Sequence, residues 1–259
     1  MTVESYVTSA DGTRIAYERT GSGPPVVLVG GGLDDGAENA PIAPELAGEF
    51  TVVNYARRGR AGSGDTPPYA LAREFEDLAA LIAMVGGRAH LFGASSGGGL
   101  ALEAAAAGLP VDRVAVYEVP YFVADDQLLQ WREYVVNLQA LLAEGRRDEA
   151  LELFMRLAGS SEEDIARARS APVWPSLRTL APTLAHDAAC LGDGHPPPRL
   201  AEITRPTLIL TGDNPFFHDA ATAIAKTVPN AQRETLAGQG HVADPTRLAP
   251  TLSRFYHAS

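Results

Sequence analysis

Short apolar runs recur along the chain and predict a series of buried β-strands. Two strand-like segments, residues 3–8 and 14–20, flank the turn Asp11-Gly12-Thr13 and predict a β-hairpin. The apolar runs that follow occupy residues 26–29, 51–55, 89–92, 111–119, 207–211 and 233–236. Runs of this length and composition are typical of strands that are buried on both faces.

Stretches with helical periodicity alternate with these runs. Within residues 71–85, apolar side chains recur every three or four positions, at Leu71, Phe75, Leu78 and Ile82. Further helices are expected at residues 100–107, 220–228 and 247–256. Strands that alternate with helices imply a mostly parallel central sheet flanked by helices on both faces, so the fold class is α/β.

One long stretch, residues 121–204, contains no good strand and interrupts the alternation. A helical face there carries Leu128, Trp131, Val135, Leu138 and Leu142, and residues 151–157 predict a second helix. Three prolines are expected to break the helical pattern further on: Pro172, Pro175 and Pro182. We expect a helical lid, residues 121–204, inserted between the sixth and seventh strands of one domain whose core is residues 1–120 and 205–259. Extra helices that only thicken the core are the alternative.

Composition and charge exclude several classes of partner. The formal net charge of −11 over 259 residues argues against a nucleic-acid partner, whose phosphates such a surface would repel. No apolar run approaches the roughly 20 residues of a membrane helix, and residues 1–5 lack the features of a signal peptide. Cys190 is the only cysteine, so no intrachain disulfide can form. A cytoplasmic protein with no membrane partner is therefore expected.

Residues 93–97, Gly-Ala-Ser-Ser-Gly, match the pattern G-x-S-x-G between a predicted strand and a predicted helix. Such a turn exposes a serine hydroxyl, and the amides at the helix start face developing negative charge. The pattern centres on Ser95 as the nucleophile, with Ser96 as the alternative. If Ser95 is the nucleophile, Ser96 would contribute an oxyanion-hole amide. The second amide is expected from the glycines that follow residue 29, from Gly32 first and from Gly31 next.

His241 lies in a glycine-containing loop between the last predicted strand and the last predicted helix, where it is the candidate general base. Among the other histidines, His90 lies within a strand and is expected to be buried and neutral. His218 lies near the end of a strand and could line the pocket.

Two carboxylates could orient His241 and stabilise its charged form, because both follow the carboxyl ends of predicted strands. Glu118 ends the strand after the nucleophile helix, and Asp213 follows the next strand. A buried charge at the end of an apolar strand is costly without a partner. A structural salt bridge with Arg57 or Arg58 is the other role open to Glu118, and a turn or helix cap is the other role open to Asp213.

Together these motifs resemble the α/β-hydrolase superfamily over nearly the whole chain. The matching segments are residues 28–32, 57–63, 93–97, 210–213 and 240–241. The chain departs from many members at Gly30, where they have histidine, and at Ala56, where they have aspartate.

A third departure concerns the acid. Many members carry it three residues after the glycine that corresponds to Gly212, and this chain has Pro215 there. Haloalkane dehalogenases, which share the fold, place their acid at the position that corresponds to Glu118. Those enzymes use an aspartate nucleophile, so Ser95 argues against their chemistry. The resemblance favours Glu118 over Asp213.

The resemblance and the candidate residues imply a serine hydrolase that acts on a small, mostly apolar ester or thioester through an acyl-enzyme. No cofactor and no metal are implied, because no cluster of suitable ligands stands out. Trp131 and Phe154 of the expected lid would line an apolar pocket. Two alternatives stay open: a non-hydrolytic enzyme of the same fold, such as a lyase, a cyclase or a carbon–carbon bond hydrolase, and an inactive ligand-binding member. An exposed apolar lid face could equally serve a homodimer.

Overall fold

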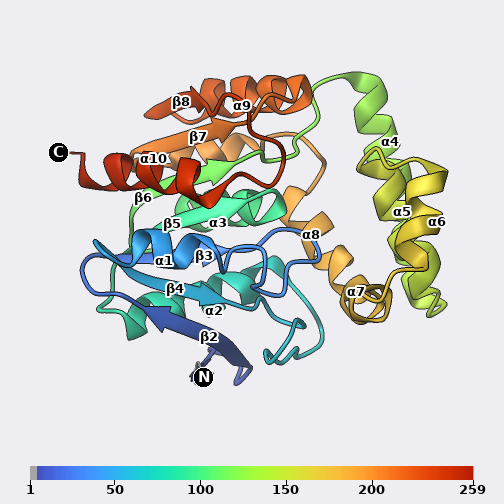
Figure 1. Ribbon diagram of the computed structural model, residues 1–259, viewed down its shortest axis with the longest axis horizontal. Helices are drawn as coiled ribbons and strands as arrows, with labels where there is room; N and C mark the ends of the chain where they lie inside the picture. The colour runs from blue at the N-terminus through green and yellow to red at the C-terminus, as the bar shows by residue number, and fades with distance from the viewer. Residues whose placement is uncertain (1–4, 259) are drawn as a thin grey trace.

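A computed structural model describes residues 5–258, which contain one eight-stranded sheet (Figure 1). The strands are β1 (Ser5–Thr8), β2 (Arg14–Thr20), β3 (Pro25–Val29), β4 (Thr51–Tyr55), β5 (Ala89–Ala94), β6 (Val111–Tyr117), β7 (Thr207–Thr211) and β8 (Ala231–Thr235). Residues 1–4, which include the start of the first predicted strand and most of the segment that argues against a signal peptide, lie outside the described residues.

The strand order is β1-β2-β4-β3-β5-β6-β7-β8. The predicted hairpin of β1 and β2 is present, and β2 is antiparallel to β4. All other neighbouring pairs are parallel. The predicted α/β class and mostly parallel sheet are therefore confirmed.

Helices cover both faces of the sheet, as the alternation of elements predicts. They are α1 (Ile42–Leu46), α2 (Leu71–Met84), α3 (Ser96–Ala106), α9 (Pro215–Thr227) and α10 (Pro245–His257). Val26 and Leu28 of β3 share an apolar cluster with α1 and α10. Val27 and Val29 share the other cluster with α2, α3 and α9. Successive side chains of a strand point to opposite faces, so one short strand contributes to both cores.

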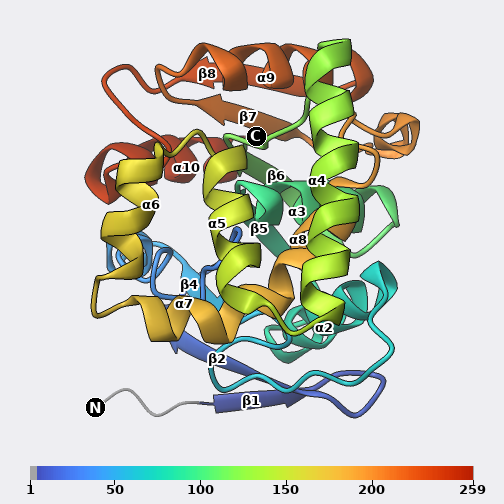
Figure 2. The same ribbon diagram turned by 90° about the vertical axis from the view of Figure 1, so that its right-hand side faces the viewer.

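A run of helices occupies the chain between β6 and β7. These helices are α4 (Asp125–Ala143), α5 (Arg147–Leu157), α6 (Glu162–Arg169), α7 (Trp174–Leu180) and α8 (Leu184–Leu191), with the 3₁₀ helices η1 (Ala181–Thr183) and η2 (Pro198–Glu202). Figures 1 and 2 show α4 to α7 beyond one end of the sheet, whereas α8 returns to pack against α3. That these helices act as a lid stays a prediction.

The prolines of this insertion separate successive helices and also lie near the starts of the helices that follow. Pro172 lies in the turn before α7, Pro175 lies in its first turn, and Pro182 lies in η1, which leads into α8. Proline fits a first helical turn because the N–H it lacks would have no intrahelical partner there. The expected breaks are therefore present at Pro172, between α6 and α7, and at Pro182, between α7 and α8, whereas Pro175 lies within a helix.

Other element boundaries differ from the sequence pattern for local reasons. Helix α9 begins at Pro215, five residues ahead of the predicted start, because Asn214 Oδ1 accepts a hydrogen bond from the backbone N–H of Phe216, 3.1 Å away. Strand β6 ends at Tyr117, two residues early, because Glu118 adopts a positive φ of 48°. In the described part of the chain, no helix is both long and apolar enough to span a membrane.

Candidate active site

The candidate residues gather where neighbouring parallel strands end. Ala94 of β5 pairs with Tyr117 of β6, so Ser95 and Glu118 are the first residues beyond two adjacent strands. The backbone N–H of Ser95 donates to the carbonyl of Tyr117, with the two atoms 2.9 Å apart. Sites at the carboxyl ends of strands are typical of parallel α/β sheets.

Ser95 occupies a strained turn between β5 and α3. Its φ of 53° and ψ of −128° are unusual for a residue with a side chain, and strain of this kind often marks functional sites. Two flanking glycines allow the turn to pack. A Cβ on Gly97 would lie 2.4 Å from the carbonyl oxygens of Val29 and Gly30, and one on Gly93 would lie 2.4 Å from the carbonyl oxygen of Gly97. The G-x-S-x-G spacing therefore has a steric cause here.

The two adjacent serines have different surroundings. The Ser96 hydroxyl is buried and donates to Oδ1 of Asp187, 2.8 Å away. Ser95 is partly exposed at the turn and lies beside Gly31, where an added Cβ would be 2.9 Å from the Ser95 Cβ. The geometry favours Ser95 over Ser96 as the nucleophile, because the Ser96 hydroxyl already has a charged partner.

Glu118 lies between the loop after β7 and the His241 ring. Its side chain is fully buried, and Oε2 lies 2.7 Å from Nδ1 of His241. The other oxygen, Oε1, accepts the backbone N–H of Gly212 at 2.8 Å. A carboxylate can only accept here, so Nδ1 carries the proton and Nε2 is free to act as a base.

Glu118 is not paired with Arg57 or Arg58 in the structure. Arg57 pairs with Glu74, and Arg58 pairs with Asp77. The alternative role weighed for Glu118 is therefore wrong.

Asp213 does not contact the His241 ring and instead holds the loop that carries it. Its Oδ2 accepts the backbone N–H of Gly238 at 2.9 Å, and its own N–H donates to the carbonyl of Gln239 at 2.9 Å. The Tyr117 hydroxyl donates to the carbonyl of Gly240 in the same loop. The structure thus brings Glu118, and not Asp213, to the histidine.

The His241 ring stacks on Phe217, with ring centroids 4.9 Å apart and planes 12° apart. Its side chain remains 47% exposed, so water can reach it. His218 is turned to a different partner, because its Nε2 lies 2.8 Å from the carbonyl oxygen of Gly212. His90 is buried as predicted, and burial lowers its pKa to about 4, which keeps the ring neutral at physiological pH.

The glycine loop after β3 runs beside the serine turn. Gly31 lies against Ser95, and a Cβ on Gly32 would lie 3.4 Å from the Phe154 ring of α5. The insertion therefore reaches the candidate oxyanion loop through Phe154. Trp131 instead bonds within the insertion, where its indole N–H donates to the carbonyl of Gly192, 2.9 Å away.

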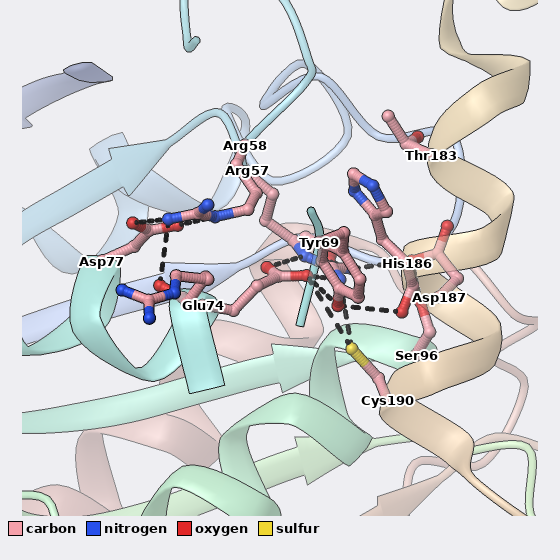
Figure 3. Close-up of polar contacts among 12 residues, drawn as sticks. Arg57, Arg58, Tyr69, Glu74, Asp77, Ser96, Thr183, His186, Asp187 and Cys190 are labelled. Carbon is pink, nitrogen blue, oxygen red and sulfur yellow. Dashed lines mark hydrogen bonds and ion pairs between the residues drawn. The ribbon is translucent and has the colours of Figure 1, made fainter. Parts of the chain in front are cut away.

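A buried cluster of charged side chains contacts the glycine loop and the start of α3, and Figure 3 shows Arg57, Glu74 and Asp187 of this cluster. Asp187 of α8 receives hydrogen bonds from Arg57 at 2.6 Å and from Arg60 at 2.8 Å to each carboxylate oxygen. Arg57 also makes two hydrogen bonds with Glu74, at 2.8 and 2.6 Å. Burial alone would raise the pKa of Asp187, but Arg60 and Arg57 hold it below its usual range, so the carboxylate stays ionised.

Asp187 is not among the residues that the sequence patterns indicate. One signal was present: His186 and Asp187 interrupt an otherwise small and apolar segment, residues 184–191. A buried carboxylate in such a helix needs a cationic partner. The arginines within residues 57–60 are candidates for that partner.

Comparison with known proteins identifies a matching family and several similar proteins. A family model described as "Alpha/beta hydrolase family" matches residues 16–251. An alpha/beta hydrolase from Sphaerobacter thermophilus DSM 20745 is 48% identical, with a TM-score of 0.88 over 97% of this chain and 100% of that one. A thermophilic esterase from Thermogutta terrifontis is 26% identical, with a TM-score of 0.71 over 98% of each chain.

A curated relative is an uncharacterized hydrolase, YraK, from Bacillus subtilis (strain 168). It is 30% identical over 163 residues, and the match spans 61% of this chain and 59% of that protein. The solved structures extend the likeness over nearly the full length, and the predicted fold family is confirmed.

Proposed function

The chain belongs to the alpha/beta hydrolase family, and on this basis we propose that it is a serine hydrolase of small, mostly apolar esters or thioesters. Hydrolase activity fits the relatives, and the chemistry is inferred from the site. The observation that carries the proposal is the 2.7 Å contact between Glu118 and His241, next to the strained turn at Ser95. A serine, a histidine and a carboxylate in such an arrangement are recognised by their roles and not by their order in the chain.

In the proposed reaction, His241 Nε2 takes the proton of the Ser95 hydroxyl as Ser95 attacks the substrate carbonyl. Glu118 accepts from Nδ1 and stabilises the imidazolium that forms. The backbone amides of Gly32 and Ser96 donate to the oxyanion of the tetrahedral intermediate. His241 then protonates the leaving group and activates water to release the acid from Ser95. The 47% exposure of the His241 side chain supports this last step, because water needs access to the ring.

The surroundings of the glycine loop support a small apolar acyl group. The Phe154 ring lies against Gly32, so the acyl chain of a bound ester would meet an aromatic surface beside the oxyanion loop. The Thermogutta terrifontis relative is described as an esterase, which agrees with an ester substrate here.

The test is hydrolysis of a panel of p-nitrophenyl esters and acyl thioesters, from acetyl to octanoyl, by wild type and by Ser95→Ala and His241→Ala variants. Turnover of the short members should fall by about 10⁴-fold or more in each variant, as when a member of a serine triad is removed. Turnover that survives in Ser95→Ala would reject the acyl-enzyme. Binding of these compounds without turnover by the wild-type protein would favour the ligand-binding alternative.

A further inference from the structure

Arg60 holds the backbone of the glycine loop. Its Nη1 donates to the carbonyl oxygen of Gly31 and to that of Asp34, the latter at 3.0 Å. In a trans peptide the C=O and N–H groups lie in one plane and point in opposite directions. Fixing the Gly31 carbonyl toward Arg60 therefore also fixes the direction of the Gly32 N–H, which points away from Arg60.

The second proposed oxyanion donor, the Ser96 amide, belongs to helix α3, and the Ser96 side chain is anchored to the same cluster. Ser96 is the first residue of α3, and its hydroxyl donates to Oδ1 of Asp187 at 2.8 Å. The Asp187 carboxylate in turn accepts from Arg60 at 2.8 Å on both of its oxygens. One buried carboxylate–guanidinium pair thus bridges the start of α3 and the glycine loop.

This pair is built to be rigid. Arg60 and Asp187 are both buried, and Arg57 adds a second cation at 2.6 Å from Asp187. Arg60 reaches both oxygens of Asp187 through its Nη2 group, and buried, charge-assisted hydrogen bonds are shorter and stronger than neutral ones. Oxyanion stabilisation depends on donors whose directions are set before the reaction begins.

We infer that Arg60 and Asp187 are positioning residues that together aim both oxyanion donors, Arg60 through the Gly31–Gly32 peptide and Asp187 through the Ser96 hydroxyl. Neither side chain needs to touch the substrate. Asp187 comes from α8, so the helical insertion contributes to the chemistry of the core and does more than cover it. The inference rests on the proposed function, because it assigns a role within the same reaction.

A matched control exists in the same segment. Arg58 and Asp77 form a second buried pair, with hydrogen bonds of 2.8 and 2.7 Å, and Figure 3 shows this pair apart from the side chains around Asp187. Among the described residues, the side chain of Arg58 makes its hydrogen bonds with Asp77 and the Arg73 carbonyl of helix α2 and with Asp11, and none with the glycine loop or α3. Substituting Asp77 therefore reports the general cost of disturbing a buried ion pair.

The experiment measures kcat and KM for p-nitrophenyl butyrate in wild type and in Asp187→Asn, Ser96→Ala and Asp77→Asn, each at a temperature where circular dichroism shows it folded. Removal of one oxyanion donor costs about 10²–10³ in kcat. We therefore expect kcat to fall by about 100-fold in Asp187→Asn and about tenfold in Ser96→Ala, with KM within about threefold. Asp77→Asn should keep kcat within about threefold of wild type.

A second readout separates positioning from stability. A butyl trifluoromethyl ketone forms a tetrahedral oxyanion on a reactive serine, so its inhibition constant should rise by the factor by which kcat/KM falls in Asp187→Asn and Ser96→Ala. The inference is wrong if Asp77→Asn loses as much kcat as Asp187→Asn, if the losses fall on KM alone, or if inhibitor affinity is unchanged. A wild-type protein that neither turns over the ester nor binds the ketone would instead overturn the proposed function, and the positioning role with it.

Discussion

Replacing Glu118 by glutamine should prevent His241 from acting as the general base while leaving the shape of the site intact. The Gly212 N–H donates to Oε1 of Glu118 at 2.8 Å, so the glutamine would keep its carbonyl oxygen at that position. Its NH₂ group would then face Nδ1 of His241, where the wild-type carboxylate accepts at 2.7 Å. An NH₂ group can only donate, so Nδ1 would have to be the unprotonated nitrogen and Nε2 would carry the hydrogen.

A histidine in this tautomer cannot take a proton from Ser95. In a serine protease with the equivalent acid-to-amide change, kcat falls about 10⁴-fold, or about 5 kcal/mol of transition-state stabilisation. The His241 side chain is 47% exposed and can find other hydrogen-bond partners in water. We therefore expect a loss in Glu118→Gln of about 10³–10⁴-fold in kcat, with KM nearly unchanged.

Steady-state hydrolysis of p-nitrophenyl butyrate measures this loss, with Asp213→Asn as the matched control. Within the described residues, the Asp213 carboxylate accepts from the backbone N–H of Gly238 in the histidine loop, and the asparagine oxygen can still accept there. Asp213→Asn should therefore stay within about tenfold of wild-type kcat, since an acceptor remains. Collapse of Asp213→Asn together with near-normal activity of Glu118→Gln would refute the assignment of Glu118 as the acid.

Three further predictions concern the core and the pocket. Burial lowers the pKa of His90 to about 4 from 6.5, so unfolding takes up a proton between these values and stability is lost as pH falls through them. The free energy of unfolding should be lower at pH 5 than at pH 7 by about 2 kcal/mol from this residue alone. Urea denaturation should show a smaller pH dependence in His90→Phe, and equal slopes would contradict the reasoning. Gly97→Ala should lower the free energy of unfolding by about 3 kcal/mol or more, because its Cβ would meet backbone oxygens at 2.4 Å; a thermal melt like that of wild type would argue against the steric account of this turn. Phe154→Ala should raise KM for the butyrate ester about tenfold with kcat within about twofold, since the ring contributes uniform binding, whereas an unchanged KM would remove Phe154 from the pocket.

Local sequence signals were enough to predict the sheet and the serine turn. The strand before Ser95, the small residues around it and the helix after it are all encoded within a few positions. The departure at Pro215 was informative as well, because it directed attention to Glu118, which the structure places against His241. The signal for the turn lies next to Ser95, whereas the signal for Glu118 is the proline at position 215, where many related proteins carry their acid.

The cluster around Asp187 could not be found in this way. Its hydrogen bonds join residues 91, 127 and 130 positions apart, to Ser96, Arg60 and Arg57. Pairing of buried charges depends on how α8 packs against α3, and no local pattern determines which arginine meets which carboxylate. Prolines also begin helices as readily as they end them, so Pro182 gave no sign that a helix followed.

The most decisive measurement is intact-mass analysis after treatment with a fluorophosphonate, followed by peptide mapping, on wild type, Ser95→Ala, Ser96→Ala and His241→Ala. We predict a single adduct on Ser95 of the wild type. It should be absent from Ser95→Ala, strongly slowed in His241→Ala, and still present on Ser95 in Ser96→Ala. An adduct that maps to Ser96, or one that persists in Ser95→Ala, would contradict the assignment of Ser95 as the nucleophile.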